Sequence, residues 1–79
     1  MKKTFKIGEC CEGGIIEVEI DNSTIQIRNL DWDSKEELKL RLFNRESFKE
    51  SQINVFMFLT EITTAYWADE IIKYIKNKI

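Results

Sequence analysis

The sequence predicts an α+β fold, in which an antiparallel meander of about four strands is followed by two helices packed on one sheet face. Two periodicities predict it. Between residues 16 and 42 apolar residues occupy alternate positions in three successive runs, as in strands with one buried face. From residue 64 onward they recur three and four positions apart, as in an amphipathic helix. The helices therefore supply the apolar surface that covers the sheet.

Length and composition indicate one small domain, residues 1–79. The chain has no proline and three glycines, so no linker divides it, and 43% apolar with 33% charged residues is typical of an ordered protein. A domain of this size removes only about 60–65% of its unfolded surface from solvent. Because so small a core contributes little stability, we expect a partner protein or a second copy of the chain to add to it.

The first strand is expected at residues 4–11, with Phe5 and Ile7 on one face. Strict alternation would place Glu9 on this apolar face, so we expect an irregularity around it. The two consecutive glycines that follow favour a tight hairpin. This hairpin leads into a second strand at residues 15–21.

A short turn then leads into a third strand at residues 24–32. With a two-residue loop, the turn length, the apolar faces and a cross-strand ion pair agree on one register. That register sets Ile20 opposite Ile25, Val18 opposite Ile27 and Glu17 opposite Arg28.

The fourth strand is expected at residues 37–43. Residues 34–37 have the pattern of a helix capping box, but the leucines that follow would spread around a helix, whereas they line one side of a strand. We therefore expect the core to receive Leu38, Leu40 and Leu42. The opposite, outer face is expected to carry Lys39, Arg41 and Phe43.

A first helix is expected at residues 48–62. Residues 47–50 form a capping-box pattern before an apolar run with few β-branched residues, although residues 54–59 also suit a central strand. The residues of this run that we expect to be buried include Ile53, Phe56, Met57 and Leu59.

A second helix is expected at residues 64–78. Its acidic residues come early and its lysines late, the order that the helix dipole favours. Trp67 and Tyr74 lie off its apolar stripe, where they either close the core boundary or present a ridge to a partner. The stripe consists of Ala65, Ala68, Ile71, Ile72, Ile75 and Ile79.

The side chains that most catalytic and metal sites require are missing. The chain has no histidine, and Cys10 and Cys11 are adjacent, a spacing that cannot chelate zinc. The acidic residues between 31 and 37 resemble a cation loop but lack the glycine and the bidentate acid of an EF-hand. We therefore expect a protein that is not an enzyme and that holds no cofactor and no metal.

The sequence also favours a cytoplasmic protein without membrane contact. No segment reaches the roughly 18 apolar residues of a membrane span. No apolar stretch of signal-peptide type follows the early lysines, and the cysteines lack the spacing of a disulfide framework.

Candidate partner-binding residues gather on the predicted outer sheet face. Parity predicts a basic, aromatic strip of Trp32, Arg28, Lys39, Arg41 and Phe43, beside an acidic row of Glu17, Glu19 and Asp21. Tryptophan and arginine dominate protein interfaces, and aromatic residues among cations also stack unpaired bases. Because the acidic row partly neutralises the strip, the pattern favours a protein partner over nucleic acid.

In its size, its lack of catalytic groups, its acidic pI of 5.1 and its richness in Lys, Ile and Asn, the chain resembles small accessory proteins of phages and mobile elements. Anti-CRISPR and other anti-defence inhibitors are common among these. The resemblance implies a non-enzymatic module that binds and inhibits a larger host protein or nucleoprotein complex. A single-stranded nucleic-acid binder is the alternative, although a net charge of −2 lacks the usual basic excess. A structural homodimer is compatible with either.

Overall fold

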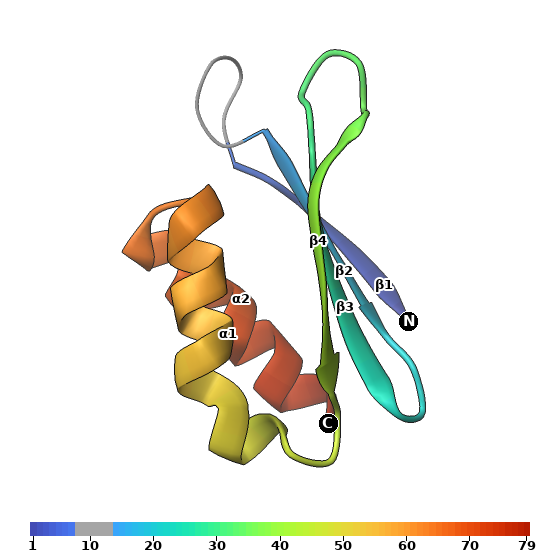
Figure 1. The fold of residues 1–79 in the computed structure, drawn as a ribbon, viewed down its shortest axis with the longest axis vertical. Helices are drawn as coiled ribbons and strands as arrows, with labels where there is room; N and C mark the ends of the chain where they lie inside the picture. Colours follow the sequence, from blue (N-terminus) through green and yellow to red (C-terminus); the bar gives the residue numbers. More distant parts are fainter. Residues whose placement is uncertain (8–13) are drawn as a thin grey trace.

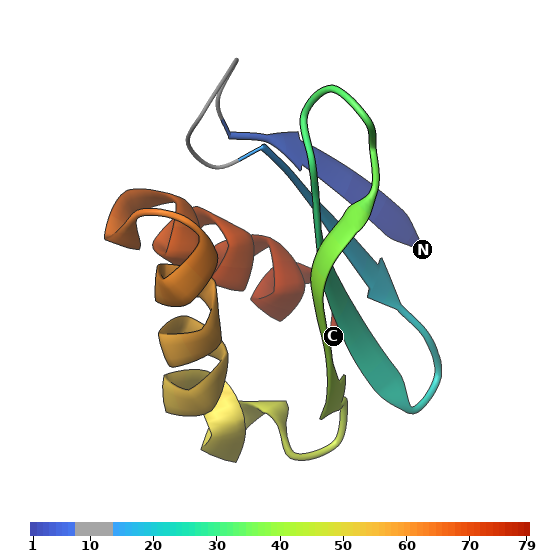
Figure 2. The same cartoon turned by 45° about the horizontal axis from the view of Figure 1, so that its top comes forward.

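The computed structural model describes residues 1–7 and 14–79 and has the predicted α+β architecture (Figure 1). One antiparallel sheet has the strand order β1-β2-β3-β4, and two helices follow it. Both helices lie against the same sheet face, here termed the inner face, opposite the outer face (Figures 1 and 2). The elements are β1 (Lys2–Lys6), β2 (Ile15–Ile20), β3 (Thr24–Leu30), β4 (Glu37–Asn44), α1 (Phe48–Ile62) and α2 (Ala65–Lys78).

Most element bounds lie within one or two residues of the prediction. The exception is β1, which begins at Lys2 and ends at Lys6. The irregularity expected around Glu9 and most of the hairpin expected after it fall in residues 8–13, outside the described ranges. Residues 54–59 belong to α1, which decides against the alternative of a central strand there.

Gly14 leads into β2 in a conformation that glycine adopts freely and other residues do not. Its φ is +60°, and a Cβ at this position would lie 2.5 Å from the carbonyl oxygen of Leu30. The Ile7 N–H donates to the Gly14 carbonyl at 3.0 Å, so the pairing of the first two strands reaches this point.

The hairpin of β2 and β3 has the predicted register. The structure sets Ile20 opposite Ile25, Val18 opposite Ile27 and Glu17 opposite Arg28. The four apolar residues of these pairs point to the inner face and are buried. A slip by one residue would expose all of them, so the apolar pattern and the short turn specify the register together.

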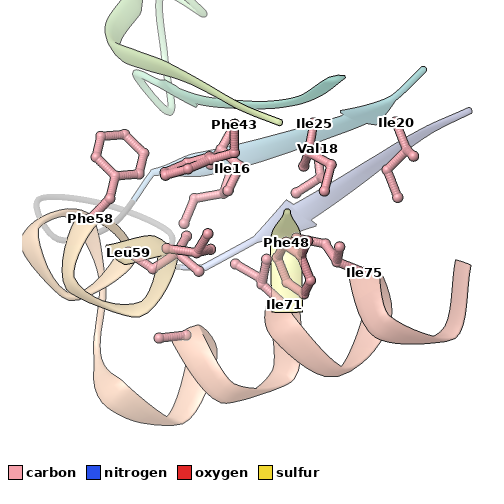
Figure 3. Packing of buried hydrophobic residues seen from close by; sticks show 13 residues of the cluster. Ile16, Val18, Ile20, Ile25, Phe43, Phe48, Phe58, Leu59, Ile71 and Ile75 are labelled. Atoms are coloured by element: carbon pink, nitrogen blue, oxygen red, sulfur yellow. The ribbon is translucent and has the colours of Figure 1, made fainter. Parts of the chain in front are cut away.

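The core fills the space between the inner face and the two helices (Figure 3). The sheet supplies alternate β-branched residues, and each helix supplies one stripe. The residues without solvent exposure are Ile16, Val18, Ile25 and Ile27 from the sheet, Phe48, Val55 and Leu59 from α1, and Ala68, Ile71 and Ile75 from α2. The predicted stripe of α2 is thus confirmed at its centre, whereas Ala65 and Ile79 at its ends are exposed.

The two helices begin differently. Before α2, the Thr64 hydroxyl accepts the N–H of Trp67 at 3.4 Å, which is an ordinary N-cap. The capping box predicted for α1 is wrong, because the Ser47 side chain makes no capping hydrogen bond. Its backbone carbonyl instead accepts the N–H groups of Glu50 and Ser51.

The predicted orientation of β4 is wrong, and the correction changes both sheet faces. Phe43 lies opposite Ile25, and residues directly opposite each other in a sheet point to the same face. Its side chain is 7% exposed and meets the ring of Phe58 edge to face, with centroids 6.2 Å apart. The leucines are exposed instead, Leu38, Leu40 and Leu42 at 58%, 42% and 57%. Leu40 and Leu42 point outward, whereas Leu38 falls at a register shift between Lys39 and Glu37.

The reversal follows from where β4 lies in the sheet. It ends shortly before α1, so an inward Phe43 enters the core beside Phe58 (Figure 3). Lys39 and Arg41 share its side, but β4 is an edge strand and their long stems reach solvent. Inward-pointing cations are therefore tolerated here, and the larger aromatic side chain takes the buried position.

Two residues of α1 that were predicted to be buried are also exposed. Ile53 is 74% and Met57 58% exposed, four residues apart on one face of the helix. The opposite face already carries Val55 and Leu59 into the core. A helix packed on one side of a two-layer domain has room for only one buried stripe.

Trp67 and Tyr74 close the core boundary. Both meet Phe5 of β1 edge to face, with ring centroids 6.5 Å and 5.6 Å from its own. Tyr66, in contrast, is 66% exposed. The contacts of Trp67 and Tyr74 favour a structural role for this pair over a ridge offered to a partner.

We predict that Phe43→Ala lowers the free energy of unfolding by about 3–5 kcal/mol, the usual cost of emptying a buried phenylalanine site. Leu42→Ala, its exposed neighbour, should change this free energy by no more than about 0.5 kcal/mol. Urea denaturation followed by circular dichroism measures both, and Phe43→Leu gives a milder loss if Phe43→Ala does not fold. If Leu42→Ala lowered the free energy of unfolding as much as Phe43→Ala, the leucines would face the core and the orientation of β4 described above would be wrong.

Candidate interaction face

The outer face of the sheet is left open by the described parts of the chain. Both helices are on the inner side, and β4 lies in front of the other strands in Figure 1. Along β4 this face carries Leu40 and Leu42, and the exposed Leu38 follows at a register shift of the strand; the three are here termed the leucine row. Three neighbouring exposed leucines on one strand form an apolar strip that solvent contacts directly.

The leucine row continues toward further apolar side chains at one end of the outer face. Leu30 lies opposite Ile15 on one side and Glu37 on the other. Leu30 and the nearby Trp32 are half-buried, and Ile15 is buried. The apolar area therefore extends from the free edge across β3 to β2 at this end of the outer face.

A line of alternating charges crosses the outer face from β1 to β4. Glu17 Oε1 lies 3.8 Å from Lys2 Nζ and 3.4 Å from Arg28 Nη1, and Arg28 Nε lies 3.1 Å from Glu37 Oε1. Each strand contributes one residue to this ionic ladder. Since two carboxylates flank Arg28, its charge is already balanced within the face.

The structure divides the predicted basic, aromatic strip. Arg28 remains on the outer face, opposite Glu17, Trp32 lies in the turn after β3, and Phe43 is in the core. Lys39 and Arg41 lie on the side of Phe43, where Lys39 Nζ meets Glu61 Oε1 of α1 at 3.2 Å and the Arg41 guanidinium lies 5.0 Å from the Phe43 ring centroid. The five residues therefore do not form one surface.

The predicted acidic row is on the outer face as expected. Glu17 and Glu19 occupy alternate positions of β2, and Asp21 follows at its end. Glu17 belongs to the ionic ladder, Glu19 lies opposite Lys2 and Gln26, and Asp21 is exposed. Neighbouring cations thus offset part of the charge of this row.

The sequence prediction missed the leucine row as an exposed feature. Along β4 the leucines alternate with Lys39, Arg41 and Phe43. Periodicity alone therefore fits either set facing the core. The signal in the sequence was Phe43 itself, because a phenylalanine beside the following helix removes more apolar area from water than a leucine does.

Trp32 lies in a hydrogen-bonded loop after β3. Asp31 Oδ2 accepts the N–H groups of Asp33 and Ser34 at 3.1 and 3.0 Å, and the Ser34 hydroxyl at 3.2 Å. Lys35 has a positive φ of 62°, and its ammonium group donates a hydrogen bond to the Trp32 carbonyl. The same ammonium lies 5.3 Å from the Trp32 ring centroid, so the loop itself already contacts this ring.

Within residues 1–7 and 14–79, no group of three or more potential ligand side chains is placed to hold a metal ion. The acidic residues of the loop at 31–37 therefore do not converge. In the same ranges no helix combines the length and the apolar character that crossing a bilayer requires.

We compared the chain with models of protein families, with curated proteins and with solved structures. None matches. The surface just described therefore has to carry any functional conclusion.

We predict that the pKa of Asp31 lies below its ordinary value of 3.8, because Ser34 and Asp33 donate hydrogen bonds to the ionised carboxylate. A pKa that is lower in the folded than in the unfolded chain means that the carboxylate stabilises the fold at neutral pH. This contribution is lost as the pH falls below 3.8 and through the folded-state pKa. An NMR titration measures the pKa, and Ser34→Ala should raise it. A value at or above 3.8 would contradict the loop geometry.

We also predict a measurable coupling between Glu17 and Arg28. A double-mutant cycle with Glu17→Gln and Arg28→Gln should give about 0.2–1 kcal/mol, and the coupling should shrink as salt is added. Zero coupling at low salt would show that the ladder does not persist in solution.

Proposed function

We propose that this protein is a non-enzymatic binding module whose outer sheet face occupies a surface of a larger protein. The observation that carries the proposal is the leucine row, exposed on a face that neither helix covers. Isolated exposed leucines are common, but a contiguous apolar strip marks an interaction site in a soluble domain.

The surroundings of the leucine row support a protein partner. Stable interfaces combine an apolar centre with a polar, charged rim. Here the row and Leu30 form the centre, and the ionic ladder with Trp32 forms the rim. Of the residues first expected to bind, Trp32, Arg28 and the acidic row keep this role, Lys39 and Arg41 flank it at the edge, and Phe43 leaves it.

The biological setting that we propose rests on the compositional resemblance to phage and mobile-element accessory proteins. In that setting the protein is a cytoplasmic inhibitor of a host defence protein, such as a CRISPR effector complex. It acts by covering a surface that the effector needs and requires no cofactor, which agrees with a chain that lacks histidine.

Single-stranded nucleic acid receives less support as a partner than it did from the sequence. The basic, aromatic strip is divided between the core and two sides of the sheet, and Arg28 is flanked by Glu17 and Glu37. Such binding would need unpaired cations beside exposed aromatic rings. A homodimer joined through the leucine row stays compatible with the geometry.

The test is capture of a partner by the immobilised protein from a bacterial lysate and, in parallel, from purified CRISPR effector complexes. The double variant Leu40→Ser/Leu42→Ser should reduce the captured amount about tenfold or more, because truncating central interface residues removes most of the binding energy. Ile53→Ser is the matched control, since Ile53 is an exposed apolar residue on α1, away from the sheet's outer face. It should leave capture unchanged.

Equal losses with both variants, or no captured protein at all, would contradict the proposed function. Binding of short single strands at low salt that weakens steeply with added salt would favour the nucleic-acid alternative. Sedimentation over a range of protein concentrations separates these results from self-association.

A further inference from the structure

β4 is an unpaired edge as well as an apolar strip. Among the described strands its only hydrogen-bonded neighbour is β3, and it is the longest strand of the sheet at eight residues. Seven of these eight residues are exposed. A long exposed edge of this kind is a template for pairing with another strand.

The direction of the free backbone groups follows from the ladder. The Arg45 N–H donates to the Ser23 carbonyl at 3.0 Å, in line with the register that sets Phe43 opposite Ile25. Hydrogen-bonded and non-hydrogen-bonded pairs alternate along an antiparallel ladder. The N–H and C=O groups of Leu40 and Leu42 therefore point away from β3, toward the free edge.

The side chains on either side of this edge differ in chemistry. On the outer side an added strand would bury Leu40 and Leu42, and on the inner side it would pass Lys39 and Arg41. Lys39 is half-exposed and shared with Glu61, and among the described residues Arg41 forms no ion pair. A strand that fits both sides alternates apolar residues with acidic ones.

A second copy of β4 does not fit this edge. Antiparallel registers centred on Lys39, Leu40 or Arg41 bring the leucines of two copies together. They place Lys39 opposite Lys39, Lys39 opposite Arg41, or Arg41 opposite Arg41, respectively. Like charges directly opposite each other destabilise a strand pair, and edge cations commonly prevent self-association.

We infer that the partner adds an extended segment of alternating apolar and acidic residues to β4 as a fifth strand. This inference rests on the proposed function and specifies its binding mode. The backbone of Leu40 and Leu42 supplies the affinity common to any strand, while the leucine row and the two cations select the sequence.

The test uses short, terminally blocked peptides that alternate valine with glutamate, and matched peptides that alternate valine with lysine. The glutamate peptide should bind about tenfold or more tightly than the lysine peptide, because only the former complements Lys39 and Arg41. The variant Lys39→Glu/Arg41→Glu should reverse this preference. Indifference to peptide charge would overturn the inference.

Hydrogen exchange locates the peptide. On saturation, the amide hydrogens of Leu40 and Leu42 should exchange about tenfold or more slowly, whereas that of Arg41, already bonded to β3, should change little. N-methylation of the glutamate peptide along one edge should abolish binding. Binding that survives N-methylation, or that leaves the two leucine amides unprotected, would contradict strand addition.

Two variants separate the backbone from the side chain. Leu40→Pro removes an N–H that faces the free edge and breaks no bond to β3, so the variant should fold but lose the peptide. Leu40→Ala keeps the N–H and should retain measurable binding. Should Leu40→Pro not fold, the N-methylated peptide makes the same comparison on the unmodified protein.

Failure of the inference is distinguishable from failure of the proposed function. Suppose that capture of a partner depends on the leucine row but that saturating glutamate peptide does not displace this partner. That result would overturn edge pairing and leave the proposed function standing. Binding of the peptide at the edge, without capture of any protein, would support edge pairing and contradict the proposed function. A dimer that protects the amides of Leu40 and Leu42 would assign the edge to a second copy.

Discussion

Phe43, near the end of β4, points into the core between the sheet and the helices. Its ring meets the ring of Phe58 edge to face, and its position in β4 lies opposite Ile25. The orientation of β4 from Lys39 to Asn44 depends on this contact, because successive side chains alternate between the two faces and turning Phe43 outward would reverse them all. With Phe43 inward, Leu40 and Leu42 point outward. The open apolar surface is thus a direct consequence of how the core is closed.

The outer face combines features that serve stability with features that do not. The ionic ladder from Lys2 to Glu37 forms one ion pair between each two neighbouring strands. Exposed ion pairs of this kind contribute little to the free energy of unfolding. The leucine row buries little against its own chain and adds apolar surface to solvent. In a domain whose core is small, that arrangement is expected where a partner supplies the missing burial.

The two edges of the sheet are protected to different degrees. β1 is short and places lysines on both sides of the strand, which discourages an added strand. β4 is longer and has cations only on its inner side, next to leucines on its outer side. The same cations that oppose pairing with a second copy favour pairing with an acidic segment, so specificity and protection arise from one pair of residues.

The sequence by itself determined the hairpin of β2 and β3 and the second helix, because each follows from local periodicity and turn chemistry. It favoured α1 as a helix, but the structure decided against a central strand at residues 54–59. The pairing of Val18 with Ile27 and the central stripe of α2 needed no knowledge of the rest of the chain. Only the tertiary structure decided which side of β4 is buried and which stripe of α1 meets the sheet. In β4 two alternating sets are candidates for one core, and the space beside Phe58 admits the phenylalanine. The candidate surface changed for the same reason: Arg28 and the acidic row follow from the parity of β2 and β3, whereas the leucine row emerges only when the helices occupy the other face.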